Sequence, residues 1–258
     1  MHSRTFKTVI MAAGKGKRMV NAEIPKVMHK VNGKPLVDHV VDLALKIGGS
    51  PVIVIVGFKR EMVTEHLTQI YDSSVAFAVQ AEQLGTGHAV MQAEPLLKDF
   101  DGDVLVLSGD VPLLTENTMR SLIDSHHKTG AVMTVLTAKV VDPTGYGRIV
   151  RLPDGSVDRI VEHKDATAEE KQVDEINSGI YVFKRKELFD GLRHVTPENS
   201  QHEYYLTDVF GYFVHHGMRV SAVLAKHFDE IRGINTVDQL KEAETALRSN
   251  SSLFGSQS

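Results

Sequence analysis

Four short, largely apolar runs occur in the first 110 residues, with segments of helical period between them. The apolar runs are Thr8–Ala13, Val52–Val56, Val75–Val79 and Val104–Leu107. Continuous apolar, β-branched runs are typical of strands that are covered on both faces. The segments with apolar residues at helical spacing are Pro35–Ile47, Met62–Ile70 and His88–Leu97. This alternation predicts an α/β fold with a parallel sheet and right-handed crossovers.

The second half of the chain changes character and predicts antiparallel strands. Pro153-Asp154-Gly155 indicates a hairpin, because turn residues there separate two apolar runs. The expected strands are Ala131–Val141, Arg148–Leu152, Val157–Val161, Ile180–Phe183 and Val220–Leu224, and the expected helices are Lys186–Arg193, Leu206–His216 and Val237–Leu247. We interpret the whole as one mixed, mainly parallel sheet with helices on both faces and a small inserted antiparallel lobe. We therefore expect one domain over residues 1–248 and a flexible, Ser-rich tail over residues 249–258.

Composition excludes several classes of function. The 258 residues include no Cys, which rules out disulfides, thiolate catalysis and Cys-based zinc sites. A formal net charge of −4 argues against non-specific nucleic-acid binding but leaves room for a small anionic ligand. No apolar run approaches the roughly 18 residues of a membrane-spanning helix, and the N-terminus lacks an apolar signal core. We expect a cytoplasmic protein that does not bind a membrane.

A glycine-rich turn follows the first apolar run, in the segment Ala12–Met19. Gly14 and Gly16 let the backbone approach a ligand and present N–H groups to an anion, while Lys15, Lys17 and Arg18 add positive charge. A dinucleotide-binding turn would need a third glycine where Met19 stands, and a P-loop pattern is absent. A plain turn with solvated lysines remains the alternative.

Two further strand ends carry unusual polar residues. Gln80 follows one strand and offers the paired donor and acceptor that can read a nucleobase. Asp110 follows another, where an ionised carboxylate needs a partner or a metal such as Mg²⁺, or caps the next turn. Lys26 follows the glycine-rich turn by a few residues, so it could contact the phosphates of a ligand bound at that turn, although by itself it would be interpreted as a solvated lysine. His88 is expected to be an ordinary helix residue. Ligands of open α/β sheets bind at the carboxyl ends of the strands, so these ends predict one site.

The second half supplies polar groups suited to a hydroxyl-rich ligand. They are Gly147, Glu162, Asn177 and Asn235, each of which is by itself an ordinary loop residue. His126-His127 and His215-His216 lack a spacing that we can place as a metal site, and we interpret them as helix-end residues.

Taken together, these motifs resemble a known family. The segment Ala12–Met19 with Pro25-Lys26 is similar to the signature of the sugar nucleotidyltransferases, or pyrophosphorylases. The further blocks that carry the resemblance are Gln80–Ala89, Gly109–Pro112, Thr144–Arg148, Val161–Ala166, Glu175–Gly179, Glu203–Asp208 and Gly233–Asn235. With these blocks, residues 5–244 closely resemble the uridyltransferase domain of the bacterial bifunctional N-acetylglucosamine-1-phosphate uridyltransferases/glucosamine-1-phosphate acetyltransferases.

The resemblance implies a Rossmann-like fold of the nucleotide-diphospho-sugar transferase type and a role for each matching residue. Uridine and ribose would be held by Ala12, Ala13, Gly14, Gln80, Gly85 and Thr86, with Gln80 reading the uracil. Arg18 and Lys26 would contact the phosphates and act in catalysis together with Asp110. The N-acetylglucosamine moiety would be held by Gly147, Glu162 and Asn177, and Mg²⁺ by Asp110 and Asn235.

The implied reaction transfers UMP from UTP to N-acetylglucosamine-1-phosphate and serves cell-wall or surface-polysaccharide precursors. The chain departs from the family in Lys17, where Thr is usual, and in a gap before Pro25 that is one residue longer than usual. The family's left-handed β-helix is missing, so we expect no acetyltransferase activity, and oligomeric state stays open. The alternatives are another sugar-1-phosphate or nucleotide, or a nucleotide-sugar-binding module that has lost turnover. The missing third glycine disfavours an NAD(P)-dependent oxidoreductase.

Overall fold

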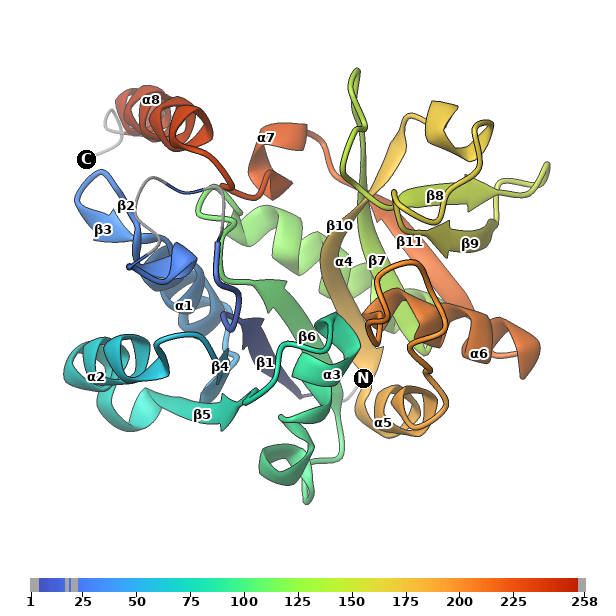
Figure 1. Ribbon diagram of the computed structural model, residues 1–258, viewed down its shortest axis with the longest axis horizontal. Helices are drawn as coiled ribbons and strands as arrows, with labels where there is room; N and C mark the ends of the chain where they lie inside the picture. Colours follow the sequence, from blue (N-terminus) through green and yellow to red (C-terminus); the bar gives the residue numbers. More distant parts are fainter. Residues whose placement is uncertain (1–4, 17–18, 20–22, 255–258) are drawn as a thin grey trace.

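The fold is built on one central sheet with helices on both faces (Figure 1). A computed structural model describes residues 5–16, 19 and 23–254, with side chains as far as residue 248. The sheet path runs β11-β7-β10-β6-β1-β4-β5. Its strands are β1 (Phe6–Met11), β4 (Val52–Val56), β5 (Val75–Val79), β6 (Asp103–Ser108), β7 (Met133–Lys139), β10 (Glu175–Lys184) and β11 (Val220–Leu224).

Strand direction explains why the sheet is mixed. β1 pairs in parallel with β4 and β6, β4 with β5, and β11 with β7. β10 runs antiparallel to both of its neighbours, β6 and β7. The chain returns from β7 to β10 without a helical crossover, which forces the strand direction to reverse. The predicted mixed, mainly parallel α/β sheet is confirmed.

Helices cover the two faces of the sheet in two groups. The helices are α1 (Leu36–Lys46), α2 (Arg60–Tyr71), α3 (Thr86–Met91), α4 (Glu116–Thr129), α5 (Arg185–Leu192), α6 (Val209–His215), α7 (Phe228–Ile231) and α8 (Val237–Phe254). Apolar residues of α1, α2 and α4 pack in one buried cluster, and those of α3, α5 and α6 pack in another. None of the described helices is long and apolar enough to cross a membrane.

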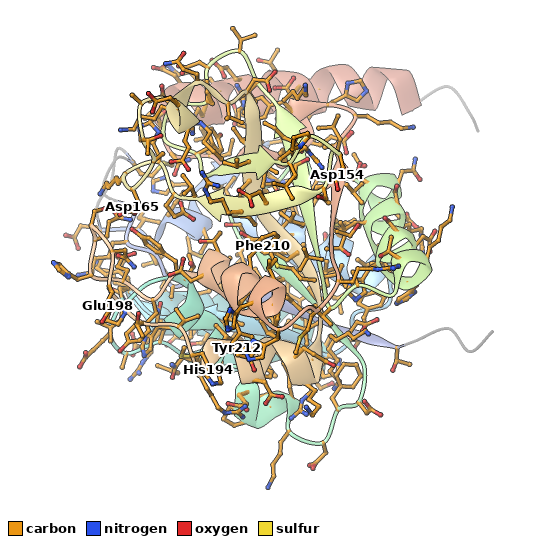
Figure 2. All side chains as sticks on the ribbon, turned by 90° about the vertical axis from the view of Figure 1, so that its right-hand side faces the viewer. Asp154, Asp165, His194, Glu198, Phe210 and Tyr212 are labelled. Carbon is orange, nitrogen blue, oxygen red and sulfur yellow. The ribbon has the colours of Figure 1, made fainter. Side chains whose placement is uncertain are left out.

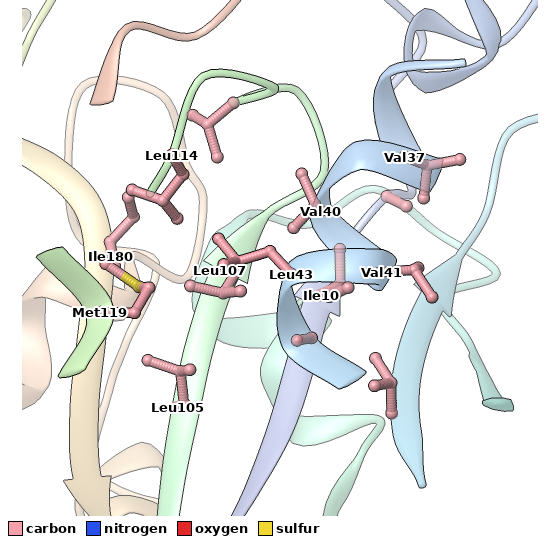
Figure 3. Packing of buried hydrophobic residues seen from close by; sticks show 14 of the residues in the cluster. Ile10, Val37, Val40, Val41, Leu43, Leu105, Leu107, Leu114, Met119 and Ile180 are labelled. Atoms are coloured by element: carbon pink, nitrogen blue, oxygen red, sulfur yellow. The ribbon is translucent and has the colours of Figure 1, made fainter. Parts of the chain in front are cut away.

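Successive strand residues face opposite clusters, as the two-residue period of a strand requires. Ile10 belongs to the first cluster, whereas its neighbour Val9 belongs to the second. Figure 3 shows Val40 of α1 close to Ile10 and Leu107 of the sheet. Burying a side chain of this size stabilises the fold by about 1.5–3 kcal/mol. The sheet is thus a rigid support for the loops at its edge.

A small antiparallel lobe projects from β10, as predicted. It consists of β8 (Arg148–Arg151) and β9 (Val157–Val161), which pair with each other, and β8 is joined to β10 at the pair Arg148–Ile176. Figure 2 shows Asp154 at the turn of this lobe and Phe210 on helix α6, on the same side of the molecule. The lobe is therefore joined to the sheet near the beginning of β10.

Two expected helices differ from the structure. The helix expected over His88–Leu97 splits into α3 and a 3₁₀ turn, Glu94–Leu97, because Pro95 lacks the N–H that an α-helix needs. The helix expected over Leu206–His216 begins as a 3₁₀ turn, Leu206–Asp208. Further 3₁₀ turns span Lys26–Met28, Asp72–Ser74 and Glu170–Gln172.

The last helix is longer than predicted, and one hairpin was not predicted. Helix α8 continues to Phe254, beyond Leu247 and into the stretch that we expected to be flexible, and residues 255–258 lie outside the described part. Strands β2 (Lys30–Val31) and β3 (Lys34–Pro35) form a hairpin that the apolar pattern missed. Its turn residues Asn32 and Gly33 both have positive φ, 51° and 79°, and Asn-Gly is a known hairpin signal.

Candidate functional site

A cleft of about 270 Å³ lies where β1, β5 and β6 end. Backbone hydrogen bonds hold the first loop in place, since Ala12 N–H donates to the carbonyl of Ile55 and Gly109 N–H to that of Met11. The sequence-predicted residues that line the cleft are Ala12, Ala13, Gly14, Lys26, Gln80, Gly85, Thr86 and Asp110. The structure thus brings together the three strand ends that the sequence singled out.

A second cavity of about 200 Å³ adjoins the first and shares Met11 and Thr86 with it. Its lining includes the three residues expected to hold a sugar, namely Gly147, Glu162 and Asn177. Two cavities that share part of their walls can hold two ligands whose reacting groups meet.

Lys26, Asp110 and Asn235 form a compact polar cluster, and two of its members, Lys26 and Asp110, line the first cleft. The Lys26 ammonium donates to Asp110 Oδ2 and, at 2.6 Å, to Asn235 Oδ1. The side chains of Lys26 and Asp110 are only 15% and 13% exposed. Lys26 therefore reaches the strand ends despite the longer gap before Pro25.

Local structure places each member of this cluster. Asn235 precedes α8, where Thr236 Oγ1 accepts from Gln239 N–H at 3.3 Å and Gln239 Oε1 accepts from Thr236 N–H at 3.1 Å. This reciprocal pair is a capping box, which fixes the start of the helix. Ile234 N–H donates to the backbone carbonyl of Asp110 at 2.9 Å and ties the two segments together.

Gly16 leaves the space that the stem of Lys26 occupies. Gly16 has φ +64°, and a Cβ added to it would lie 2.5 Å from Cβ of Lys26. A side chain at position 16 is therefore excluded both by the backbone and by contact with Lys26. Lys17 and Arg18, which the sequence also singled out, lie outside the described residues.

Electrostatics keep Asp110 ionised. Burial raises the pKa of its carboxyl, but the adjacent Lys26 ammonium, together with hydrogen bonds from Ser108 and the backbone, outweighs burial and holds that pKa below its usual range. The carboxylate of Asp110 and the amide oxygen of Asn235 are oxygen donors of the kind that Mg²⁺ prefers. They already surround a positive charge, the Lys26 ammonium, so they fit a cation. Within residues 5–16, 19 and 23–248, no group of three His, Asp or Glu side chains forms a further metal site.

Gln80 is held in one orientation by His88. The Gln80 amide donates to the Gly85 carbonyl at 3.0 Å and lies 3.2 Å from His88 Nδ1. Gln80 is 3% exposed, so its amide is not free to turn in solvent. Because both amide hydrogens have partners, the side-chain carbonyl is the group left to accept from a ligand. Sequence reasoning missed this role of His88, since nothing in the local pattern pairs it with Gln80.

The glycines after Gln80 accommodate backbone from a distant segment. A Cβ on Gly85 would lie 2.6 Å from the carbonyl oxygen of Tyr204, and Gly87 N–H donates to the same oxygen at 2.8 Å. Leu206 N–H donates to Thr86 Oγ1 at 3.0 Å. The sequence suggested that these glycines allow a ligand to approach the backbone. The structure shows that they allow the backbone of Tyr204 to approach. Glu203, next to Tyr204, also lines the first cleft.

In the second cavity, Thr207 contacts Glu162 and Tyr181 contacts Asn177. Sequence reasoning had assigned no role to Thr207 or Tyr181. Thr207 donates to Glu162 Oε1 at 3.1 Å. Burial raises the pKa of the Glu162 carboxyl, the Thr207 hydroxyl opposes this rise, and neighbouring carboxylates add to it. The hydroxyl of Tyr181 lies 2.9 Å from Asn177 Oδ1 and 2.7 Å from Asn177 Nδ2.

A bulge in β10 makes the contact between Asn177 and Tyr181 possible. Asn177 pairs with Thr137 and Tyr181 with Val135, so β10 advances four residues where β7 advances two. Gly179 within the bulge has φ +78°. Gly179 was the only local signal of this irregularity.

The histidine pairs lie at helix ends, as expected. His126 and His127 are in the last turn of α4, and His215 is in the last turn of α6. His127 Nε2 lies 2.9 Å from a carboxylate oxygen of Asp103, which begins β6. Asp110 follows the other end of β6, so this pair is remote from the clefts.

Comparisons with known proteins agree with this geometry. A model of the family described as "Nucleotidyl transferase" matches residues 7–246. The chain is 50% identical over 240 residues to the "Bifunctional protein GlmU" of Exiguobacterium sibiricum, covering 93% of the chain and 52% of the relative. It is also 50% identical to the protein of that name from Geobacillus thermodenitrificans, covering 93% of the chain and 51% of the relative. The chain thus spans about half the length of the curated relatives that it matches.

Two solved structures share the fold. One, described as a glucose-1-phosphate thymidylyltransferase from Bacillus anthracis, has a TM-score of 0.77 at 20% identity, covering 95% of this chain and 96% of that chain. A UDP-glucose pyrophosphorylase complexed with UDP-glucose has a TM-score of 0.74 at 19% identity, covering 95% and 98%. At these identities the likeness establishes the sheet and helix arrangement alone.

Proposed function

The chain belongs to the nucleotidyl transferase family, and we propose that it transfers UMP from UTP to N-acetylglucosamine-1-phosphate. The products are UDP-N-acetylglucosamine and pyrophosphate. The observation that carries the proposal is the pair of adjoining cavities, the first of which is lined by Lys26 and Asp110 of the Lys26–Asp110–Asn235 cluster. UTP fits the first cavity and the sugar-phosphate the second, with the reacting phosphates near the shared wall.

The orientation of Gln80 supports a uracil base. Its side-chain carbonyl is the acceptor left for a ligand, because the amide hydrogens are directed to Gly85 and His88. Uracil carries an N–H at ring position 3, whereas cytosine carries an acceptor at the same position. A fixed acceptor therefore favours UTP over CTP, since CTP would leave two acceptors facing each other.

The second cavity supports a hydroxyl-rich, amide-bearing ligand. Glu162 and Asn177 each have a protein partner that fixes the side chain, Thr207 for the first and Tyr181 for the second. Fixed carboxylate and amide groups can recognise the hydroxyl and acetamido groups of N-acetylglucosamine. The 50% identity to proteins named GlmU supports this choice of sugar, whereas the fold alone does not discriminate between sugars.

The proposed chemistry is an in-line displacement at the α-phosphorus of UTP. An oxygen of the sugar-phosphate forms the new P–O bond, the bond from the α-phosphorus to the bridging oxygen breaks, and pyrophosphate leaves with the electron pair. The attacking phosphate carries a charge of about −1.5 to −2 near pH 7, so no general base is required. The residues have to align and neutralise two polyanions.

Lys26 and Arg18 supply positive charge to the phosphates in this proposal. Asp110 and Asn235 would hold Mg²⁺, which supplies charge neutralisation across both substrates. Asp110 and Glu203 line the first cleft, and Lys26 already pairs with Asp110, so a further cation would offset the repulsion between the Glu203 carboxylate and a triphosphate. This balance of charge supports a cation-dependent reaction.

Pyrophosphate release across a grid of nucleoside triphosphates and sugar-1-phosphates tests the proposal. With Mg²⁺ present, we expect the highest kcat/KM for UTP with N-acetylglucosamine-1-phosphate. A maximum at another pair would keep the reaction class and overturn the assignments of Gln80, Glu162 and Asn177. Tight UTP binding without turnover for any pair would favour the nucleotide-sugar-binding module instead.

A further inference from the structure

The ammonium of Lys26 stands where the proposed function requires a divalent cation. It donates to Asp110 Oδ2 and to Asn235 Oδ1, the second at 2.6 Å. These are the two side chains that would hold Mg²⁺. Both Lys26 and Asp110 are largely shielded from solvent, at 15% and 13% exposure, so water does little to screen the ion pair.

An ammonium and a divalent cation cannot share this position. Mg²⁺ binds oxygen ligands at about 2.0–2.1 Å and demands near-octahedral geometry. A lysine that uses the same two oxygen atoms would sit against the metal, and the two positive charges would repel each other strongly in a shielded site. Either the ammonium or the metal can hold Asp110 and Asn235 at one time.

The surroundings of Lys26 allow its ammonium a second position. Its stem is held beside Gly16, whose missing Cβ leaves room for Cβ of Lys26. Beyond Cγ, the side chain has further rotatable bonds that can redirect the ammonium. Lys26 also lines the cleft with Gly14 and Gln80, where the proposed function places the nucleotide. Rotation of the side chain would therefore take the ammonium from Asp110 toward phosphates bound in this cleft.

We propose that Lys26 is a built-in substitute cation, which holds Asp110 and Asn235 together until a divalent metal arrives with the nucleotide. The inference rests on the proposed function, because it assumes that Asp110 and Asn235 are the metal ligands. It goes further by assigning Lys26 two positions, one on Asp110 and Asn235 and one on the phosphates. The free protein then binds divalent cations weakly, and the metal enters as its complex with UTP.

Binding of Mn²⁺ in the absence of nucleotide tests the inference, with free Mn²⁺ followed by electron paramagnetic resonance. Lys26→Met keeps the apolar stem and removes the charge, and Lys26→Ala removes both. We expect each variant to bind Mn²⁺ about tenfold or more tightly than the wild-type protein. The matched control is Lys30→Met, which removes the same charge from an exposed side chain. At about 0.15 M salt, distant charges are screened, so this control should bind Mn²⁺ as the wild type does.

A second substitution locates the Mn²⁺. Asp110→Asn in the Lys26→Met background should abolish the gain in affinity. If the gain persists without Asp110, the Mn²⁺ is bound elsewhere and the inference is wrong. The inference is also overturned if both Lys26 variants, folded by their thermal unfolding, bind Mn²⁺ no more tightly than the wild type.

The complex of Mn²⁺ with UTP separates this inference from the proposed function. We expect wild-type protein to bind the complex and Asp110→Asn to bind it much more weakly. Suppose that Asp110→Asn binds the complex weakly but the Lys26 variants bind free Mn²⁺ as the wild type does. Asp110 would then remain a metal ligand, and only the substitute-cation role of Lys26 would be rejected. Unweakened binding by Asp110→Asn would count against the metal site and hence against both proposals.

Discussion

The side-chain amide of Gln80 lies 3.2 Å from Nδ1 of His88, eight residues farther along the chain. The same amide donates to the Gly85 carbonyl at 3.0 Å, so both contacts use its nitrogen. A backbone carbonyl can only accept, which fixes the nitrogen of the amide on that side and the oxygen on the other. His88 thus acts through Gln80, as a positioning residue for the base.

The first prediction concerns His88→Ala. The lost hydrogen bond contributes about 0.5–1.5 kcal/mol to holding the Gln80 amide in its orientation. We therefore expect the preference for UTP over CTP to fall roughly three- to tenfold. KM for UTP should rise more than kcat falls, because the chemistry lies at the phosphates. Steady-state kinetics with both nucleotides measures this split, and His88→Asn, which retains an acceptor, should recover part of the preference. An unchanged UTP to CTP ratio in His88→Ala would refute the positioning role.

The second prediction concerns Asp110→Ala. Removing the carboxylate removes a proposed metal ligand, and we expect kcat to fall about 10²- to 10³-fold, or about 2.7–4 kcal/mol of transition-state stabilisation. Asp124→Asn, which changes an exposed carboxylate on α4, should leave kcat unaltered. Pyrophosphate release under saturating substrates measures both variants. Near wild-type turnover of Asp110→Ala would dispose of the metal assignment.

Sequence patterns predicted the sheet well, because short runs rich in apolar and β-branched residues stand out whether the strand is fully buried, as Val52–Val56 is, or partly exposed, as Val220–Leu224 is. The observed limits of Val52–Val56, Val75–Val79, Val157–Val161 and Val220–Leu224 agree residue for residue with the expected strands. Strand ends also located the cleft, since polar residues after a fully apolar run are conspicuous. Helix ends were less certain, as the break before Pro95 and the extension of α8 show.

Contacts between distant segments could not be predicted from local pattern. Lys26 and Asp110 are 84 residues apart, and Thr207 and Glu162 are 45 apart, so only the folded sheet brings each pair together. The resemblance named Lys26 as a phosphate ligand, but no motif indicated that it would contact the proposed metal ligands. Residues that act by holding another side chain, such as Tyr181, carry no chemical signature of their own.

The third prediction concerns Gly16→Ala. The added methyl would meet Cβ of Lys26 at 2.5 Å, and the φ of +64° adds about 1–2 kcal/mol of backbone strain. We expect loss of stability together with at least a roughly tenfold loss of kcat/KM, because Lys26 is displaced. Gly130→Ala is a matched control, since Gly130 has φ +65° and no atom within 4 Å of an added Cβ. It should lose only the stability that the backbone strain costs and no activity, and equal activity losses in the two variants would contradict the Lys26 mechanism.

The fourth prediction concerns the buried Asp103. Burial raises the pKa of its carboxyl, but the hydrogen bond with His127 and the nearby rings of His126 and His127 outweigh burial and lower that pKa. A carboxyl whose pKa is lower in the folded than in the unfolded state stabilises the fold above its usual pKa, near 3.9. That stabilisation disappears as the pH falls through the lowered folded value.

Asp103→Asn should therefore lose about 1–3 kcal/mol of unfolding free energy at pH 7, and the difference from wild type should shrink below about pH 4. Urea unfolding at pH 7, 4 and 3 measures this difference. Asp101→Asn alters an exposed carboxylate two residues earlier and should show no such pH dependence. A constant deficit across the pH range would mean that Asp103 acts through packing and not through its charge.

The fifth prediction concerns Tyr181→Phe, which removes one hydroxyl from beneath the second cavity. That hydroxyl contacts both ends of the Asn177 amide, whose Oδ1 also accepts from Gly179 N–H at 3.1 Å. With the hydroxyl gone, the amide keeps one partner and loses part of its fixed orientation. Since Asn177 is proposed to bind the sugar, KM for N-acetylglucosamine-1-phosphate should rise roughly three- to tenfold.

UTP provides the internal control for this variant, because Gln80 and the Gly85 loop hold the base independently of β10. KM for UTP and the UTP to CTP ratio should stay at wild-type values in Tyr181→Phe. The same rise in KM for both substrates would indicate a general loosening of β10. An unaltered KM for the sugar-phosphate would mean that the bulge backbone alone orients Asn177, through the hydrogen bond from Gly179.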